Sequence, residues 1–199
     1  MKDQARRFTI VDTRSMSDLS VEIDVELPVT GNLLPLFFPK TNRAGKLRVS
    51  DQPLCPTCFQ PWPKEREVPE DVHVIVPTAG FRTRRGRPYT GLVIDVRGLD
   101  FNPAINPNVL NAETQEVYSA AYAEWDVATK IGMVAYSNDI GAALKNGRVG
   151  SEPLIIRAVA VRGRLKSDVI ISNNDAVLIH AAATVQNFLR DCKVVILIG

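Results

Sequence analysis

Cysteine is scarce in this chain, and so are long apolar runs and charge of a single sign. Three cysteines among 199 residues are too few for a disulfide-built scaffold, so a hydrophobic core has to hold the fold together. Apolar runs such as VVILI near the C-terminus are far shorter than the roughly 20 residues that cross a bilayer, so we expect no transmembrane segment. The formal net charge of +2 argues against nucleic acid as a partner, because dedicated binders are strongly basic.

Recognisable leader and catalytic motifs are missing too. The opening MKDQARRFTIVD is basic but has no apolar stretch after it, so we expect either a cytosolic protein or the mature or excised part of an exported one. There is no G-x-S-x-G, H-E-x-x-H, G-x-G-x-x-G or P-loop. Asp95 is the only acid in a segment that looks like a buried strand, and pairing with Arg97 explains it more simply than catalysis does. We therefore expect a protein that is not an enzyme and needs no cofactor.

Residues 1–28 predict a β-hairpin. In LSVEIDVEL, residues 19–27, apolar and acidic side chains alternate strictly, as in a strand with one buried face. FTIVD, residues 8–12, supplies the other strand, and the polar RSMSD between them suits a turn. Since a lone hairpin is marginal in water, this one has to pack on another surface.

Residues 29–88 predict an extended, proline-rich arm. Ten of the thirteen prolines lie between Pro28 and Pro88, and proline both fixes φ and removes a hydrogen-bond donor, so few helices form there. The arm has more apolar side chains than water tolerates, and we predict that copies of the chain associate through them. The alternative, that they cover their own domain, stays open. The predicted interface residues are Leu33, Leu34, Leu36, Phe37, Phe38, Phe59 and Trp62.

Residues 89–199 predict an α/β domain, with a mixed α+β arrangement also possible. The continuous apolarity of GLVIDV (91–96) and VVILI (194–198) is typical of central strands that are buried on both faces. Residues 154–163 and 168–172 predict two further strands, and the apolar periodicity of 174–190 predicts the main helix. The expected domain is a small sheet with one main helix.

The sharpest local motif is the C-x-x-C of LCPTCFQPWP. Cys55 and Cys58 could form half of a tetrahedral zinc site, with His73 and one further group completing it. Redox chemistry is disfavoured because Pro61 and Pro63 prevent the helix that would lower a thiol pKa. The favoured interpretation is a local Cys55–Cys58 disulfide in an oxidising compartment, or two reduced thiols in a surface turn.

A basic segment, FRTRRGRP, follows the arm. Its arginines suit phosphate or another anion, and Phe81 and Tyr89 flank them. The alternative is a solvated loop whose charges pair with nearby acids. The candidate anion-binding residues are Arg82, Arg84, Arg85 and Arg87.

Three strings in residues 89–199 carry a resemblance: YTGLVIDVRGLDFNPAINPNVLN, RVGSEPLIIRAVAVRG and SDVIISNNDA. They resemble the C-terminal region of secreted bacterial proteins related to small outer-membrane lipoproteins and to flagellar assembly protein T. SMSDLSVEIDVELPVTGNL resembles the last strands of the lipoprotein-like domain that often precedes that region. The resemblance implies an envelope scaffold, located in the periplasm or at the outer-membrane surface.

Together these features predict a non-enzymatic structural subunit of a bacterial cell-envelope or flagellum-associated ring or filament. We expect a homo-oligomer that associates through its proline-rich arm, with other envelope proteins as further partners. The alternative is a zinc- or thiol-dependent binding domain or enzyme organised around Cys55 and Cys58.

Overall fold

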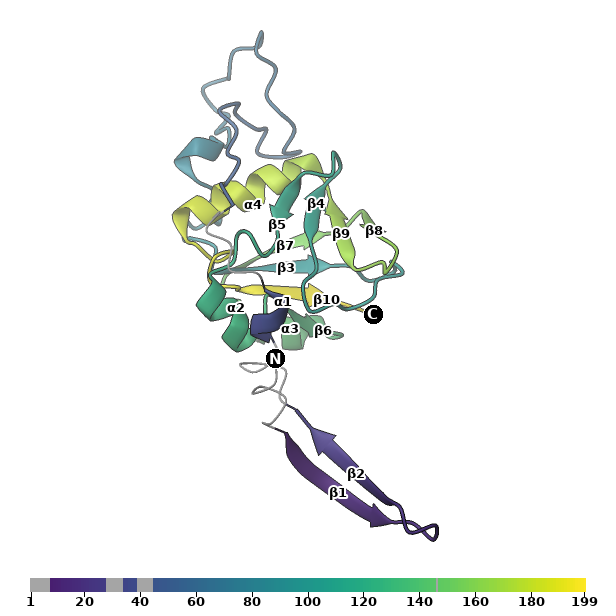
Figure 1. The fold of residues 1–199 in the computed structure, drawn as a ribbon. Coiled ribbons are helices and arrows are strands. Elements are labelled where there is room, and N and C mark those ends of the chain that lie inside the picture. Colours follow the sequence, from purple (N-terminus) through teal and green to yellow (C-terminus); the bar gives the residue numbers. More distant parts are fainter. Residues whose placement is uncertain (1–7, 28–33, 39–44, 146) are drawn as a thin grey trace.

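Two four-stranded sheets, four α-helices and a separate two-stranded hairpin make up the part of the chain described by the computed structural model (Figure 1). The structure describes residues 8–27, 34–38, 45–145 and 147–199. The α/β class expected from the sequence is confirmed, with a mixed α+β character. The domain is richer than expected, because the described residues form a second full sheet beside the first.

The first sheet is parallel, with the strand order β6–β10–β3–β7. Val195 of β10 pairs with Val93 of β3 at its centre, and both side chains are fully buried. The prediction that the two most apolar runs form central strands is confirmed. The strands are β3 (Gly91–Asp95), β6 (Ala135–Ser137), β7 (Pro153–Arg157) and β10 (Val194–Leu197).

Both faces of this sheet are covered, which explains why its central strands are apolar at every position. Successive strand residues point to opposite faces, so Leu92 packs into the main core while Val93 packs into a smaller cluster on the other side. That smaller cluster includes Ala143 of α3 (Ile140–Lys145). The main core lies between the parallel sheet and the second sheet, and residues of α4 contribute to it.

The second sheet has the order β5–β4–β9–β8 and mixes parallel and antiparallel pairs. The prediction of one strand over 154–163 is wrong: β7 ends at Arg157 and β8 begins at Ala160 in the other sheet. The Ala158 N–H donates to the Asp95 carbonyl at 2.9 Å, and the Val159 N–H donates to the Ile170 carbonyl at 2.8 Å. The strands are β4 (Val109–Asn111), β5 (Glu116–Tyr118), β8 (Ala160–Arg162) and β9 (Asp168–Ile171).

The main helix, α4 (Asn173–Val185), covers the second sheet beside β4 and β5 (Figure 1). It begins at Ser172, whose hydroxyl accepts the Asp175 N–H at 3.0 Å, a side-chain N-cap. It ends earlier than the expected residue 190, because the chain turns extended at Gln186 and sends Phe188 into the core. The shorter helix α2 (Trp125–Ile131) ends at Gly132, where φ is +78°.

The proline-rich segment is attached to this domain at several points. Its described helical turns are α1 (Leu34–Phe37) and the 3₁₀ turn η2 (Pro77–Ala79). The Phe81 N–H donates to the carbonyl of Ala181 in α4 at 3.1 Å. The proline-rich segment therefore contacts the α/β domain at these points.

A further attachment of the proline-rich segment is made by His180 of α4, whose side chain is buried. Its Nδ1 accepts the backbone N–H of Arg48 at 2.8 Å, and its Nε2 donates to the Val117 carbonyl at 2.9 Å. Burial lowers the pKa of His180, which keeps the imidazole neutral and able to accept the Arg48 bond. The His180 side chain thus connects α4 to β5 and to the proline-rich segment by hydrogen bonds.

We expect the buried His180 to make the free energy of unfolding depend on pH. Because the pKa of His180 lies below the value of about 6.5 for an unfolded histidine, the unfolded chain binds more protons than the folded one below that pH. The free energy of unfolding should therefore fall as pH is lowered through about 6.5 and be insensitive to His180 above it. His180→Asn should lose about 1–3 kcal/mol near neutral pH by leaving a carbonyl unpaired and should flatten this pH dependence.

The measurement is thermal unfolding followed by circular dichroism between about pH 8 and about pH 5, a range that spans the ordinary histidine pKa. The matched control is His73→Asn, the same change at an exposed histidine. An equal acid-side loss of stability in wild type and His180→Asn would contradict the prediction.

Candidate functional site

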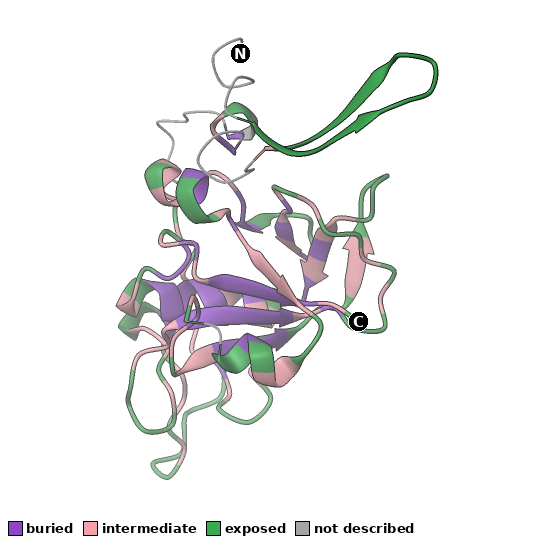
Figure 2. Ribbon diagram, turned by 90° about the horizontal axis from the view of Figure 1, so that it is seen from below, coloured by how far each residue is buried: buried purple, intermediate pink, exposed green. Residues whose placement is uncertain are grey.

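The N-terminal hairpin is the most unusual surface of the molecule. It consists of β1 (Thr9–Ser15) and β2 (Val21–Glu26), paired antiparallel. Every residue of both strands is exposed, and Figure 2 shows the hairpin extending from the α/β domain with no buried position. The sequence required a surface for this hairpin to pack on, and the described residues of its own chain do not provide one.

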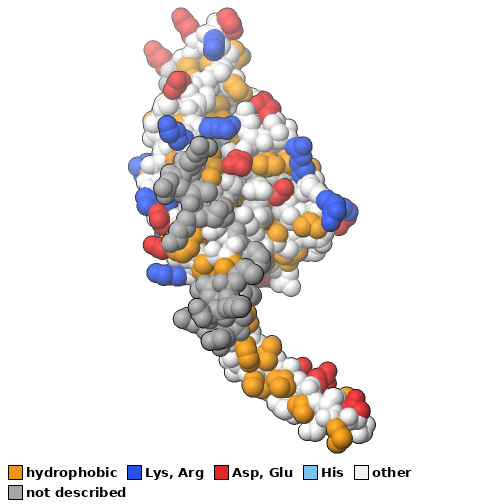
Figure 3. All heavy atoms as spheres, in the orientation of Figure 1, with side chains coloured by type: hydrophobic (Ala, Val, Ile, Leu, Met, Phe, Trp, Pro, Cys, Tyr) orange, Lys and Arg blue, Asp and Glu red, His pale blue; other side chains and the backbone are white. Residues whose placement is uncertain are grey.

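One face of the hairpin is apolar. The cross-strand pairs Ile10–Val25, Thr13–Ile23 and Ser15–Val21 share this face. Val21, Ile23 and Val25 are 58%, 50% and 52% exposed, and Figure 3 shows hydrophobic side chains gathered along the hairpin. We call this set the apolar face.

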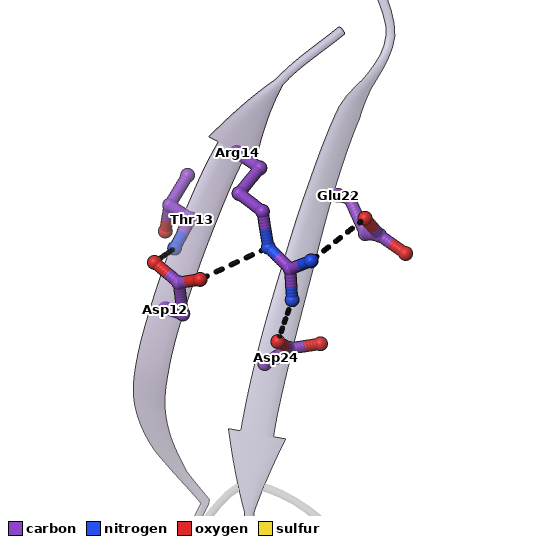
Figure 4. A network of polar contacts seen from close by, with 5 residues as sticks. All are labelled: Asp12, Thr13, Arg14, Glu22 and Asp24. Carbon is purple, nitrogen blue, oxygen red and sulfur yellow. Dashed lines mark hydrogen bonds and ion pairs between the residues drawn. The ribbon is translucent and has the colours of Figure 1, made fainter.

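The opposite face carries acids arranged around a single arginine (Figure 4). The Arg14 guanidinium lies 2.9 Å from Asp12 and 3.7 Å from Glu22, and also contacts Asp24. Glu26 pairs with Thr9 on this same face. Three carboxylates therefore pair with one guanidinium and a fourth shares the face, and these exposed ion pairs add only about 0–1 kcal/mol each. The hairpin is amphipathic, with a net negative outer face.

The hairpin tip is a tight turn that is held by Asp18. Its carboxylate accepts the backbone N–H of Ser20 at 3.0 Å and the Ser20 hydroxyl at 2.6 Å, and these bonds lower the pKa of Asp18. Leu19 takes a left-handed conformation, φ +67°, and is 95% exposed. The turn therefore presents a further large apolar side chain to the outside.

The predicted interface residues of the arm are placed differently from this hairpin. Leu34 and Phe38 are each only 3% exposed and belong to the main core. The Phe38 carbonyl accepts the indole N–H of Trp125 in α2 at 3.1 Å. The predicted interface is therefore wrong at these two positions, because they cover their own domain. Leu33 and the side chain of Phe37 lie outside the described residues.

The other three predicted interface residues are more accessible. Leu36 is exposed. Phe59 is half-buried, with its ring edge against Phe81 at a centroid distance of 6.4 Å. Trp62 is half-buried, and its indole N–H donates to the Arg66 carbonyl at 2.9 Å. They do not form one patch with the buried pair, so the arm is a poorer assembly surface than the hairpin.

Cys55 and Cys58 are both free thiols, so the predicted disulfide is not formed in this structure. Within the described ranges, no group of three or more His, Cys, Asp or Glu side chains is placed to hold a metal ion, so His73 does not join the two cysteines in a chelate. Hydrogen bonds from the N–H groups of Cys58 and Thr57 lower the pKa of Cys55. The argument that Pro61 and Pro63 leave no helix to lower a thiol pKa is therefore incomplete, because hydrogen bonds within the turn also lower the pKa of Cys55.

The four candidate anion-binding arginines lie on one exposed turn. Gly86 closes it, with its N–H donating to the Thr83 carbonyl at 2.8 Å. Arg87 forms an ion pair with Glu152, and the Arg82 guanidinium lies 3.5 Å from the Gly86 carbonyl. Arg84 and Arg85 extend at the tip, and all four are exposed. Anion binding by this turn stays a prediction.

Asp95 at the end of β3 is paired as expected. Both of its carboxylate oxygens bind the Arg97 guanidinium, at 2.9 and 2.7 Å. The hydrogen bond from Arg97 is the largest cause that holds the pKa of Asp95 below its usual value. A carboxylate held ionised in this way is a structural ion pair, and it is not a general acid at neutral pH.

A polar pocket of about 220 Å³ lies over His180 and was not anticipated from the sequence. Arg48, Glu113, Glu116 and Asn173 contribute to its walls. Both ring nitrogens of His180 already hold backbone groups, so the histidine does not serve as a free base in this pocket. The signal that could have revealed it, a histidine on a helix face rich in alanine, is equally typical of a packed core position.

Comparison with known families places the α/β domain. The family described as Treponema pallidum Tp0624, second domain, matches residues 91–199. The chain belongs to this family. A comparison with curated proteins gives no match. The Tp0624 second-domain match covers β3 to β10 and leaves out the hairpin and the proline-rich segment.

Among the described residues, no helix combines the length and apolar character that a bilayer crossing requires.

We predict that Phe38 stabilises the fold and that Leu36 does not. Phe38→Ala empties a buried aromatic position and should cost about 3–5 kcal/mol of unfolding free energy. Leu36→Ala, two residues earlier on an exposed side chain, should change it by less than about 0.5 kcal/mol. Denaturant unfolding of the two variants measures both values, and equal stabilities would show that the arm does not pack on its own domain.

Proposed function

We propose that this chain is a non-enzymatic structural subunit of a bacterial cell-envelope or flagellum-associated assembly, and that copies associate through the apolar face of the N-terminal hairpin. The observation that carries this proposal is the exposure of Val21, Ile23 and Val25 on a strand with no covering surface among the described residues. The sequence assigned self-association to the proline-rich arm. Burial of Leu34 and Phe38 moves the proposed contact to the hairpin.

The energetic argument is the cost of leaving this face in water. Burying a fully exposed valine or isoleucine side chain contributes about 1.5–3 kcal/mol, so each half-exposed side chain contributes about half of that. A two-stranded ribbon is marginal alone and becomes stable when its apolar face is packed. The contact therefore stabilises the hairpin itself as well as the assembly.

A second copy suits this face better than a dissimilar surface does. Two identical ribbons with their apolar faces together form a four-stranded sandwich in which every strand is covered on one side. The four carboxylates around Arg14 then remain on the outside, in water. Association by the strand edges would instead leave both apolar faces exposed.

The envelope setting of the proposal comes from the sequence. Residues 89–199 resemble the C-terminal region of secreted proteins related to small outer-membrane lipoproteins and flagellar assembly protein T. Membership of the Tp0624 second-domain family covers nearly the same residues. The hairpin precedes this domain and supplies a contact element, a combination that fits a scaffold subunit.

The test is the molar mass of the reduced protein, measured by light scattering over a range of concentrations. We expect wild type to be a dimer or larger. Val21→Ser with Ile23→Ser removes four apolar side chains per dimer, a loss of roughly 4 kcal/mol or several hundredfold in affinity. The variant should be monomeric with unchanged thermal unfolding of the α/β domain.

The matched control changes the other face of the same strand. Glu22→Ser with Asp24→Ser alters two equally exposed positions and should keep the wild-type mass. A wild-type monomer at high concentration, or a Val21→Ser/Ile23→Ser variant of unchanged mass, would overturn the proposal.

A further inference from the structure

Cys55 and Cys58 sit at the tip of a small, well-supported hairpin turn. The Trp62 N–H donates to the Pro53 carbonyl and the Cys55 N–H donates to the Gln60 carbonyl, both at 2.8 Å. On the outer side of the turn, Leu54 exchanges two backbone hydrogen bonds with Ile75, at 2.8 and 2.9 Å. The C-x-x-C is therefore held on three short antiparallel segments, although no helix follows it.

Both thiols belong to this one turn. Hydrogen bonding from the backbone of Cys58 and Thr57, and from the Cys58 side chain, holds the pKa of Cys55 below its usual value. Phe59 takes a left-handed conformation, φ +58°, and its N–H donates to the Cys55 carbonyl at 2.9 Å. Both thiols are free, and Cys58 is exposed. Backbone N–H groups that point at a sulfur offset the charge of a metal-bound thiolate.

We propose that this turn is half of a tetrahedral zinc site that is completed by Cys55 and Cys58 of a second copy of the chain. Two cysteines at this spacing supply two of the four ligands that structural zinc requires. Soft thiolate ligands select zinc over magnesium or calcium. The proposal does not depend on the apolar face, because the hairpin and residues 45–76 extend from opposite ends of the α/β domain in Figure 1.

In this proposal the second copy supplies the remaining two ligands. Among the described residues, no third His, Cys, Asp or Glu joins the pair, and His73 is exposed but is not grouped with it. Residues 52–63 contain no charged side chain, so the turn itself adds no like charge to the contact. A two-fold contact presents the same patch from both partners, and it therefore provides four thiolates around one ion.

Binding involves no redox step. Four S–H groups lose their protons to solvent, four Zn–S bonds form, and the waters bound to the zinc ion leave. The tetrathiolate has a net charge of two minus, which the N–H donors of the two turns offset. Affinity should therefore rise with pH as proton release becomes easier.

The experiment adds zinc to reduced, full-length protein and measures the bound metal and the molar mass after gel filtration. To separate this site from the apolar face, the starting protein is the Val21→Ser/Ile23→Ser variant. We expect about one zinc per two chains and a doubling of mass that a chelator reverses. Cobalt in place of zinc should give the intense charge-transfer absorption of four thiolates around one tetrahedral ion.

Three variants make the outcome specific. Cys55→Ser with Cys58→Ser should abolish both metal binding and the mass change. Cys192→Ala, at a buried cysteine, should retain both, as should His73→Ala. One zinc per chain in a monomer, loss of zinc in His73→Ala, or no retained zinc at all would overturn the shared site. Because the starting variant already lacks two apolar side chains of the hairpin, these results test the zinc site separately from association through the apolar face.

Discussion

The parallel pairing of β3 with β10 is the contact on which the rest of the structure depends. Val93 and Val195 lie opposite each other with no exposed surface, and neighbouring residues of each strand enter different cores. A strand pair that is buried on both faces requires a cover on each side. Helix α3 contributes to one cover, and the second sheet with α4 provides the other.

This double cover also determines what the proline-rich segment does. Helix α4 packs beside β4 and β5, and its His180 side chain and Ala181 carbonyl hold residues 48 and 81. Phe38 fills a place in the main core beside α2. The proline-rich segment thus contacts its own domain at these points, whereas residues 63–71 are exposed throughout.

Two surfaces remain without a cover among the described residues, and they lie at opposite ends of the molecule (Figure 1). The hairpin presents apolar side chains and the C-x-x-C turn presents thiols, so the two contacts use different chemistry. Self-complementary contacts at both ends join copies into an open chain, whereas a single one closes at a dimer. Under the two proposals above, such a chain would be a filament-like scaffold, and metal supply would control one of its two joints.

The sequence by itself determined the features that depend on near neighbours: the alternation in β2, the apolar runs of β3 and β10, the Ser172 cap, and the Asp95–Arg97 pair two residues apart. Only the tertiary structure decided that residues 154–163 divide between two sheets, that His180 holds Arg48 from 132 positions away, and that Phe38 is core while Val21 is not. The physical reason is that burial depends on which distant segment arrives to cover a side chain. An apolar pattern predicts that a face will be buried. Only the folded structure shows which segment of the chain, if any, covers it.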